Sequence, residues 1–163
     1  MEISKKTDYA LRMLAALVRE PDDILSVRTA ADANDVPYSF ARAIQHDLVR
    51  AGIIESLRGS HGGMRLAVDP NKITLLEVVT AVQGPLTLGS CESMGPDGGI
   101  CPRIGECNFN PIFCSACAIV SEFFNSVTLA QVVEGSKAPS LPERYWGVDA
   151  FVPLMRDISV DLA

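Results

Sequence analysis

All five cysteines of this 163-residue chain lie between Cys91 and Cys117. The segment around them is rich in glycine and proline, a composition that is poor at forming a packed core but suits a loop that wraps a metal ion or a cluster. An odd number of cysteines also fits poorly with a complete disulfide framework. We therefore expect metal binding or redox chemistry in this part of the chain.

Three of the five, Cys91, Cys101 and Cys107, fall in sequence that predicts no regular structure, with separations of ten and six residues. Zinc prefers four Cys or His ligands in a closed tetrahedral site, usually with a Cys-x-x-Cys turn. Iron–sulfur clusters bind thiolates strongly and tolerate a substitute for the fourth ligand. The loop cysteines therefore favour an iron–sulfur cluster, 4Fe–4S or 2Fe–2S, while zinc and a thiol–disulfide switch stay open as alternatives.

The remaining pair, Cys114 and Cys117, is spaced by three residues within a predicted apolar helix, which places both thiols on one face. Buried cysteines are common in such helices, so we expect this pair to belong to the core rather than to a metal site. A role as redox thiols is the alternative. A thiol oxidoreductase would need an exposed Cys-x-x-Cys at a helix start, so we do not expect an enzyme.

Three predicted helices precede the cysteines. Residues 4–19 carry apolar side chains at the spacing of one buried helical face. Ser26 is a suitable N-cap for a short helix that continues to residue 34. The third helix covers residues 38–50, ends before Gly52, and has a predicted buried stripe of Phe40, Ile44 and Leu48, with Ala51 at its end.

A glycine-rich hairpin follows the third helix. Residues 53–58 and 63–68 are short β-prone segments on either side of Gly59-Ser60-His61-Gly62-Gly63. Three helices followed by such a hairpin predict a winged helix-turn-helix, a mainly α fold with a small β-hairpin wing. A small α+β domain without a nucleic-acid role is the alternative, because fold pattern alone does not fix function.

The second half of the chain contains a long predicted helix between two short capped ones. Thr74 and Glu77 form a predicted capping box for residues 74–82, and Thr128 begins a second one. The long helix, residues 111–125, is apolar with little charge. We expect it to pack against a second copy of the chain to form a homodimer; burial within the monomer is the alternative.

These elements divide the chain into four parts. We expect a winged helix-turn-helix DNA-binding domain over residues 1–84 and a cysteine-rich cluster-binding loop over residues 85–110. Residues 111–135 would hold the dimerisation helix and the short helix after it. Residues 136–163 contain no motif, and we assign this C-terminal tail no role.

The charge distribution permits a nucleic-acid partner. The net charge of −6 argues mildly against one, but residues 36–66 contain four arginines against two acidic residues, and the acidity is concentrated further along the chain. The first eight residues do not resemble a secretory signal. No apolar run approaches the roughly 20 residues needed to cross a bilayer. We therefore expect a cytoplasmic protein with reduced thiols and no membrane partner.

In a helix-turn-helix, the second helix of the pair enters the major groove of double-stranded DNA with its first residues at the base edges. Here that is the third helix, and Arg42 is suited to a bidentate contact with guanine, worth about 1–3 kcal/mol of discrimination. Each candidate could instead be solvated surface. The candidate contacts are Tyr38, Ser39 and Arg42 on this helix, Arg58 and His61 on the hairpin, and Lys5 and Lys6 at the start of the first helix.

The sequence resembles the IscR/NsrR type of bacterial winged-helix repressors, within the Rrf-two superfamily. The resemblance covers roughly residues 1–135. It is carried by ISKKTDYALR at residues 3–12, LVRAGII at residues 48–54, RGSHGG at residues 58–63, the three loop cysteines and Val127-Thr128-Leu129. It implies a homodimer whose long helices cross and whose cysteine loops lie near the partner's first helix.

The resemblance also implies a ligand set. In cluster-bearing members three loop cysteines bind the iron–sulfur cluster, and Cys91, Cys101 and Cys107 match them, although the first gap is longer than usual. Asp8 matches a position that supplies the fourth ligand from the other subunit in the nitric-oxide-sensing branch. The alternative role for Asp8 is an acid stabilised by the helix dipole. Another branch uses a histidine where this chain has Asn110, so histidine ligation of that kind is not expected.

These observations together predict a dimeric DNA-binding transcriptional regulator, expected to be a repressor, that senses iron, nitric oxide or redox state through an iron–sulfur cluster. A cluster-free thiol switch or a zinc-binding regulator is the alternative, because cluster-free members of the superfamily exist. A thiol oxidoreductase is the remote alternative.

Overall fold

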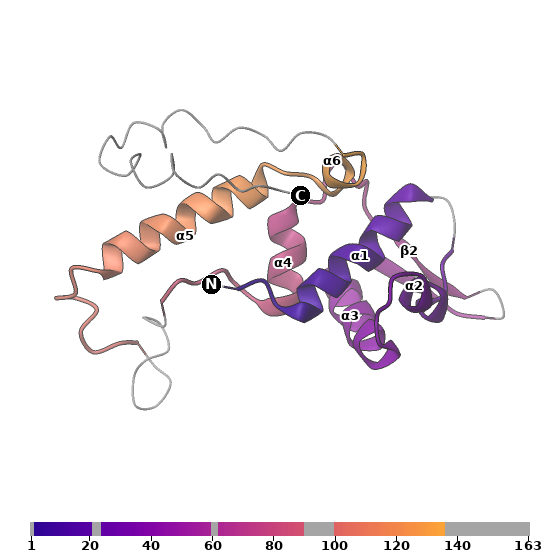
Figure 1. Ribbon diagram of the computed structural model, residues 1–163, viewed down its shortest axis with the longest axis horizontal. Coiled ribbons are helices and arrows are strands. Elements are labelled where there is room, and N and C mark those ends of the chain that lie inside the picture. Colours follow the sequence, from indigo (N-terminus) through magenta and orange to yellow (C-terminus); the bar gives the residue numbers. More distant parts are fainter. Residues whose placement is uncertain (1, 21–23, 60–61, 90–99, 136–163) are drawn as a thin grey trace, which may run out of the picture.

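The computed structural model describes residues 2–20, 24–59, 62–89 and 100–135. Within these residues the chain forms six helices and one two-stranded antiparallel sheet. Helices α1 to α4 and the hairpin make one packed body, and the long helix α5 projects from it (Figure 1). A mainly helical fold with a small hairpin is thus confirmed.

The first three helices form where capping residues and apolar spacing predict them. Ser4 caps α1 (Lys5–Arg19) by accepting a hydrogen bond from the Thr7 amide, and Ser26 caps α2 (Val27–Ala33) in the same way through Thr29. α3 spans Tyr38–Arg50. The apolar face of α1 is buried against α3, α4 and α6, and its fully buried residues include Ala10, Met13, Leu14 and Leu17.

The buried face of α3 differs from the predicted one. Ala41, Ile44 and Leu48 are buried, whereas Phe40 is 42% exposed and Ala51 is exposed, so the prediction that these two residues face the core is wrong. Positions 41, 44 and 48 lie on one side of a 3.6-residue helix, and position 40 is about one-quarter turn away. Phe40 instead places its ring against Tyr9 of α1, edge to face at 5.7 Å.

The hairpin forms a wing beside α3. Strand β1 (Ile54–Leu57) pairs with β2 (Gly63–Leu66), so both strands are slightly shorter than predicted. A third segment, which the sequence analysis missed, adds to the sheet at Leu25: its amide donates to the Met64 carbonyl at 3.0 Å and its carbonyl accepts from the Met64 amide at 2.8 Å. The wing is therefore attached to the segment that leads into α2.

Both predicted capping boxes are confirmed. Thr74 and Glu77 cap α4 (Leu75–Gln83), and Thr128 and Gln131 cap α6 (Leu129–Val133). The two caps lie together, because Thr74 and Thr128 form an antiparallel bridge, and α6 packs against α1. The chain therefore returns to the body after α5.

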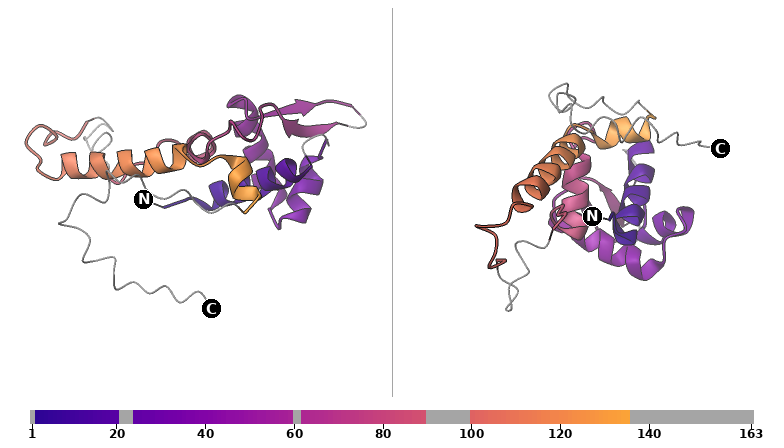
Figure 2. Two further views of the ribbon diagram at one scale, coloured as in Figure 1. Left: turned by 90° about the horizontal axis from the view of Figure 1, so that it is seen from above. Right: turned by 60° about the vertical axis from the view of Figure 1, so that its left-hand side comes forward.

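Helix α5 (Asn110–Asn125) contains no buried residue, so the alternative of burial within the monomer does not hold for the described chain. Exposed apolar side chains lie at its start, where Phe109 is 66% and Ile112 is 59% exposed. Figure 2 shows α5 as an arm that extends away from the body on the side opposite the wing. Among the described residues, no helix has the length and apolar character that crossing a membrane requires.

Candidate nucleic-acid interface and metal centre

A concave surface of about 270 Å³ lies where α2, α3 and the wing meet. We call it the α3–wing groove. Its walls come from the first turn of α2, the outer side of α3 and both ends of the hairpin loop. The polar and charged side chains that line it are Ser26, Arg28, Tyr38, Arg42, Gln45 and Ser56.

Two of the residues predicted to read DNA line this groove. Tyr38 and Arg42 are exposed on the outer side of α3, and Ser39 is exposed beside them. The groove carries two arginines and no carboxylate among its lining residues, so the charged side chains that line it are positive although the whole chain is negative.

Arg28 is a groove residue that sequence reasoning missed. Its guanidinium lies over the Tyr38 ring, 4.6 Å from the ring centroid, which is a cation–π contact. This contact connects α2 to the first turn of α3. The predicted fold could have pointed to Arg28, because the first helix of a helix-turn-helix crosses the DNA backbone and its exposed cations then face phosphates.

Gln45 and Ser56 were also missed. The Gln45 amide nitrogen donates to the Ser56 hydroxyl at 3.3 Å, which links α3 to β1 on the floor of the groove. On the wing, Arg58 is exposed next to Gly59, whose φ of +118° is a backbone conformation that favours glycine. His61, the other predicted wing contact, lies outside the described residues.

The two predicted lysine contacts differ in their surroundings. The Lys5 side chain is exposed, with its amine 3.8 Å from a carboxylate oxygen of Asp8. Lys6 forms an ion pair and hydrogen bond with Asp47 of α3. The hydrogen bond from Lys6, more than any other contact, lowers the pKa of Asp47 below its usual value of 3.8. A phosphate contact by Lys6 would compete with this ion pair.

Asp8 lies in the first turn of α1 and is partly exposed. Its carboxylate accepts from Arg12, with an Nη2-to-Oδ2 distance of 2.9 Å. Both proposed roles for Asp8 remain compatible with this position, since an acid in the first turn interacts favourably with the helix dipole. If Asp8 bound a metal, its carboxylate would have to share or give up the contact with Arg12.

Two of the three loop cysteines are described. Cys101 and Cys107 are half-buried and free of disulfides, and Cys91 lies outside the described residues. Each of the two begins a tight turn, because its carbonyl accepts from the amide three residues later, at 3.0 Å for Ile104 and 3.3 Å for Asn110. Within the described ranges, no three His, Cys, Asp or Glu side chains come together as a metal site.

Cys114 and Cys117 are not part of the core, so that prediction is wrong. Cys114 is exposed and Cys117 is half-buried. The prediction failed because it took the apolar character of α5 to mean burial, whereas this helix packs only part of its surface against the body. Cys117 Sγ accepts a hydrogen bond from the Leu88 amide at 3.1 Å, which brings the segment after α4 against α5.

Comparisons with known proteins agree with this architecture. The sequence profile of the family Rrf2, described as iron-dependent transcriptional regulator, matches residues 3–135. The regulator NsrR of Shouchella clausii is 37% identical over 92 residues, which cover 56% of this chain and 62% of that protein. The repressor NsrR of Streptomyces coelicolor is 29% identical over 143 residues, covering 86% of this chain and 94% of that protein.

A solved structure with this fold is CymR, the global cysteine regulator of B. subtilis. It superposes with a TM-score of 0.62 at 22% identity, covering 83% of this chain and 98% of that one. At this level of identity the likeness shows the fold alone. These two NsrR relatives are named as transcriptional regulators, in agreement with the expectation that the chain is not an enzyme.

Proposed function

This chain belongs to the Rrf2 family of transcriptional regulators, and on that premise we propose that it is a DNA-binding repressor that senses its signal through an iron–sulfur cluster. Such a regulator needs two sites, a DNA-reading surface and a cluster site. The first is carried by the α3–wing groove. The second rests on the loop cysteines and on the family to which the chain belongs.

The α3–wing groove supports DNA binding because its chemistry matches what a duplex presents. Arg42 projects from the second turn of α3, where a bidentate contact to guanine is available. Arg28 and Arg58 flank it on α2 and on the wing, where positive charges would meet phosphates. We assign base reading to Tyr38, Ser39 and Arg42, and positioning to Arg28, Arg58, His61 and the lysines Lys5 and Lys6.

A selection experiment tests the DNA-reading part. The full-length protein would be incubated with a pool of random duplexes, and bound sequences would be recovered over several rounds. We expect enrichment of one sequence with two similar half-sites in inverted orientation, because a two-fold protein reads a two-fold operator. Recovery of unenriched DNA, with equal affinity for all sequences at about 150 mM salt, would contradict base reading by this surface.

The loop cysteines fit an iron–sulfur cluster by the chemistry of their donors. Cys101 and Cys107 are thiols in tight turns, half accessible and not joined in a disulfide. We propose Cys91, Cys101 and Cys107 as cluster ligands and Asp8 of a partner subunit as the fourth. When bound, such a cluster supplies iron that exchanges ligands and electrons.

The exposed length of α5 supports a homodimer. The helix has no buried residue in the monomer, and the large apolar side chains Phe109 and Ile112 at its start are exposed. A second copy packed along α5 would remove this apolar area from water. In such a dimer, any change in the cysteine loops would alter the relative placement of the two α3–wing grooves, and DNA affinity would change only if the two arrangements bind DNA differently.

Absorbance and metal content test the cluster part. Anaerobically purified protein should absorb broadly between about 300 and 450 nm and contain iron and acid-labile sulfide in equal amounts. The variants C101S and C107S should lose this absorbance, while C114S, on the exposed part of α5, serves as the matched control and should keep it. A protein that stays colourless and iron-free after reconstitution would reject the cluster and leave DNA reading intact.

A further inference from the structure

Cys114 and Cys117 line a recess of about 250 Å³ beside the first turns of α5. The recess is bounded by the segment after α4 on one side and by the end of the cysteine loop on the other. Its walls are mainly apolar, and no charged side chain of the described residues lines it. The residues that line it include Leu86, Ile104, Asn110 and Phe113, with the two cysteines.

The spacing of the two thiols favours a bridging atom over a direct bond between them. Side chains three residues apart on a helix have Cβ atoms about 5–6 Å apart, whereas a disulfide requires about 3.8 Å. Two sulfurs that bind one metal ion from opposite sides lie about 4.6 Å apart, because each metal–sulfur bond is about 2.3 Å long. The regular helix at Cys114 and Cys117 therefore suits a two-thiolate chelate without distortion.

We propose that Cys114 and Cys117 form a binding site for a soft monovalent cation, specifically copper(I). Thiolate ligands select copper(I) among the common metals, and this ion is stable with two ligands. Zinc would need four, and no third His, Cys, Asp or Glu joins this pair among the described residues. Binding replaces two S–H bonds by two Cu–S bonds and releases two protons, with no change of oxidation state.

The surroundings of the thiols support this assignment. The Leu88 amide donates to Cys117 Sγ at 3.1 Å, and this donor would offset the single negative charge that the complex of one cation with two thiolates carries. Because ligands must lose protons, apparent affinity should rise with pH. Its two thiolates are distinct from the proposed cluster ligands, which lie on the preceding loop.

Copper titration of the full-length apo protein under anaerobic conditions, with a chromophoric copper(I) chelator as competitor, tests the site. We expect one equivalent to be withdrawn from the chelator by the wild type and by the loop variant C91S/C101S/C107S, and none by C114S/C117S. Withdrawal by C114S/C117S but not by the loop variant would place copper on the loop cysteines and overturn the proposal.

Two further measurements separate this site from the cluster and from folding defects. C114S/C117S should take up iron and sulfide like the wild type; loss of the iron–sulfur absorbance in this variant would assign the pair to the cluster and overturn the proposal. In the wild type, one equivalent of copper(I) should protect Cys114 and Cys117 from alkylation, as read by peptide mass spectrometry. Alkylation of both at an unchanged rate would also overturn it.

Discussion

Lys6 in the first turn of α1 forms an ion pair with Asp47 on α3. The Asp47 side chain is mostly buried, and Arg50 lies 3.5 Å from its other oxygen. The same end of α1 is joined to α4, because the Thr7 hydroxyl, which is fully buried, donates to Gln83 at 2.8 Å. The start of α1 therefore connects α3 to α4, the helix that precedes the cysteine loop.

Removal of Lys6 should destabilise the protein. In K6M the mostly buried Asp47 loses its main partner, and we expect a loss of about 1 kcal/mol in the free energy of unfolding, measured by urea denaturation. The control K5M, at an exposed lysine with a longer contact, should change it by less than about 0.5 kcal/mol. In a double-mutant cycle, D47N should remove most of the effect of K6M. If the stability losses of the two single variants simply add in the double variant, the ion pair does not contribute to the free energy of unfolding.

The pH dependence of stability should reflect Asp47. Its pKa is lowered in the folded state, chiefly by the hydrogen bond from Lys6, so the folded protein binds this proton less readily than the unfolded chain. The resulting stabilisation is complete above the unfolded pKa and is lost as pH falls through 3.8 toward the folded value. Urea unfolding between about pH 5 and pH 2 should therefore show a smaller decline in D47N than in the wild type. Equal declines would show that Asp47 is not the titrating group.

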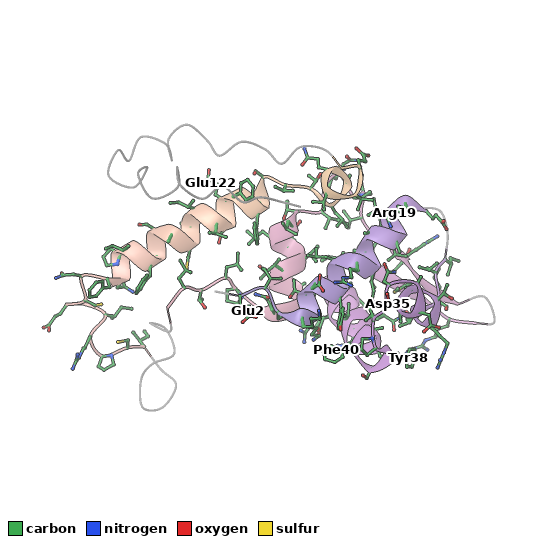
Figure 3. The ribbon with its side chains drawn as sticks, in the orientation of Figure 1. Glu2, Arg19, Asp35, Tyr38, Phe40 and Glu122 are labelled. Carbon is green, nitrogen blue, oxygen red and sulfur yellow. The ribbon has the colours of Figure 1, made fainter. Side chains whose placement is uncertain are left out.

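Arg42 should determine DNA sequence preference. We expect R42A to weaken binding to the selected operator by about 1–3 kcal/mol and to relax specificity at one base pair, as measured by fluorescence anisotropy at fixed salt. The matched control is R19A, because Arg19 lies at the far end of α1, away from Tyr38 and Phe40 (Figure 3). An equal loss of affinity for operator and random DNA would show that Arg42 contacts phosphate rather than a base.

The capping box of α4 should contribute measurably to the free energy of unfolding. In T74A the Glu77 amide loses its acceptor, and we expect a cost of about 1 kcal/mol in thermal or urea unfolding. The control is T80A, an exposed residue within the same helix, where alanine has the higher helix propensity and should be neutral or slightly stabilising. Destabilisation by both substitutions would indicate a general intolerance of α4 rather than a cap.

Gly63 should be intolerant of any side chain. A Cβ at this position would lie 2.6 Å from the Leu25 carbonyl oxygen, in the bridge that attaches the wing to the body. Because the obstacle is backbone, we expect G63A to cost about 1–3 kcal/mol in the free energy of unfolding and to weaken DNA binding through displacement of the wing. At Gly105 an added Cβ meets nothing within 4 Å, so G105A should be close to neutral.

Local spacing in the sequence was sufficient to predict the helices and the hairpin, although both strands are slightly shorter than predicted. Ser26, Thr74 and Thr128 all cap the helices expected of them, because a cap depends only on residues three positions apart. The hairpin was predictable for the same reason, from two β-prone runs and a glycine-rich tip. Arg42 was predictable as an outward residue once α3 was known.

Tertiary packing decided which faces of these elements are covered. Phe40 is exposed and Ala41 is buried because the small methyl group, not the large ring, allows α3 to approach its neighbours closely. Arg28 enters the groove only because α2 and α3 pack together and bring it over Tyr38. Cys114 and Cys117 are accessible because α5 leaves the body. The sequence of an apolar helix does not reveal whether its own chain or another surface covers it.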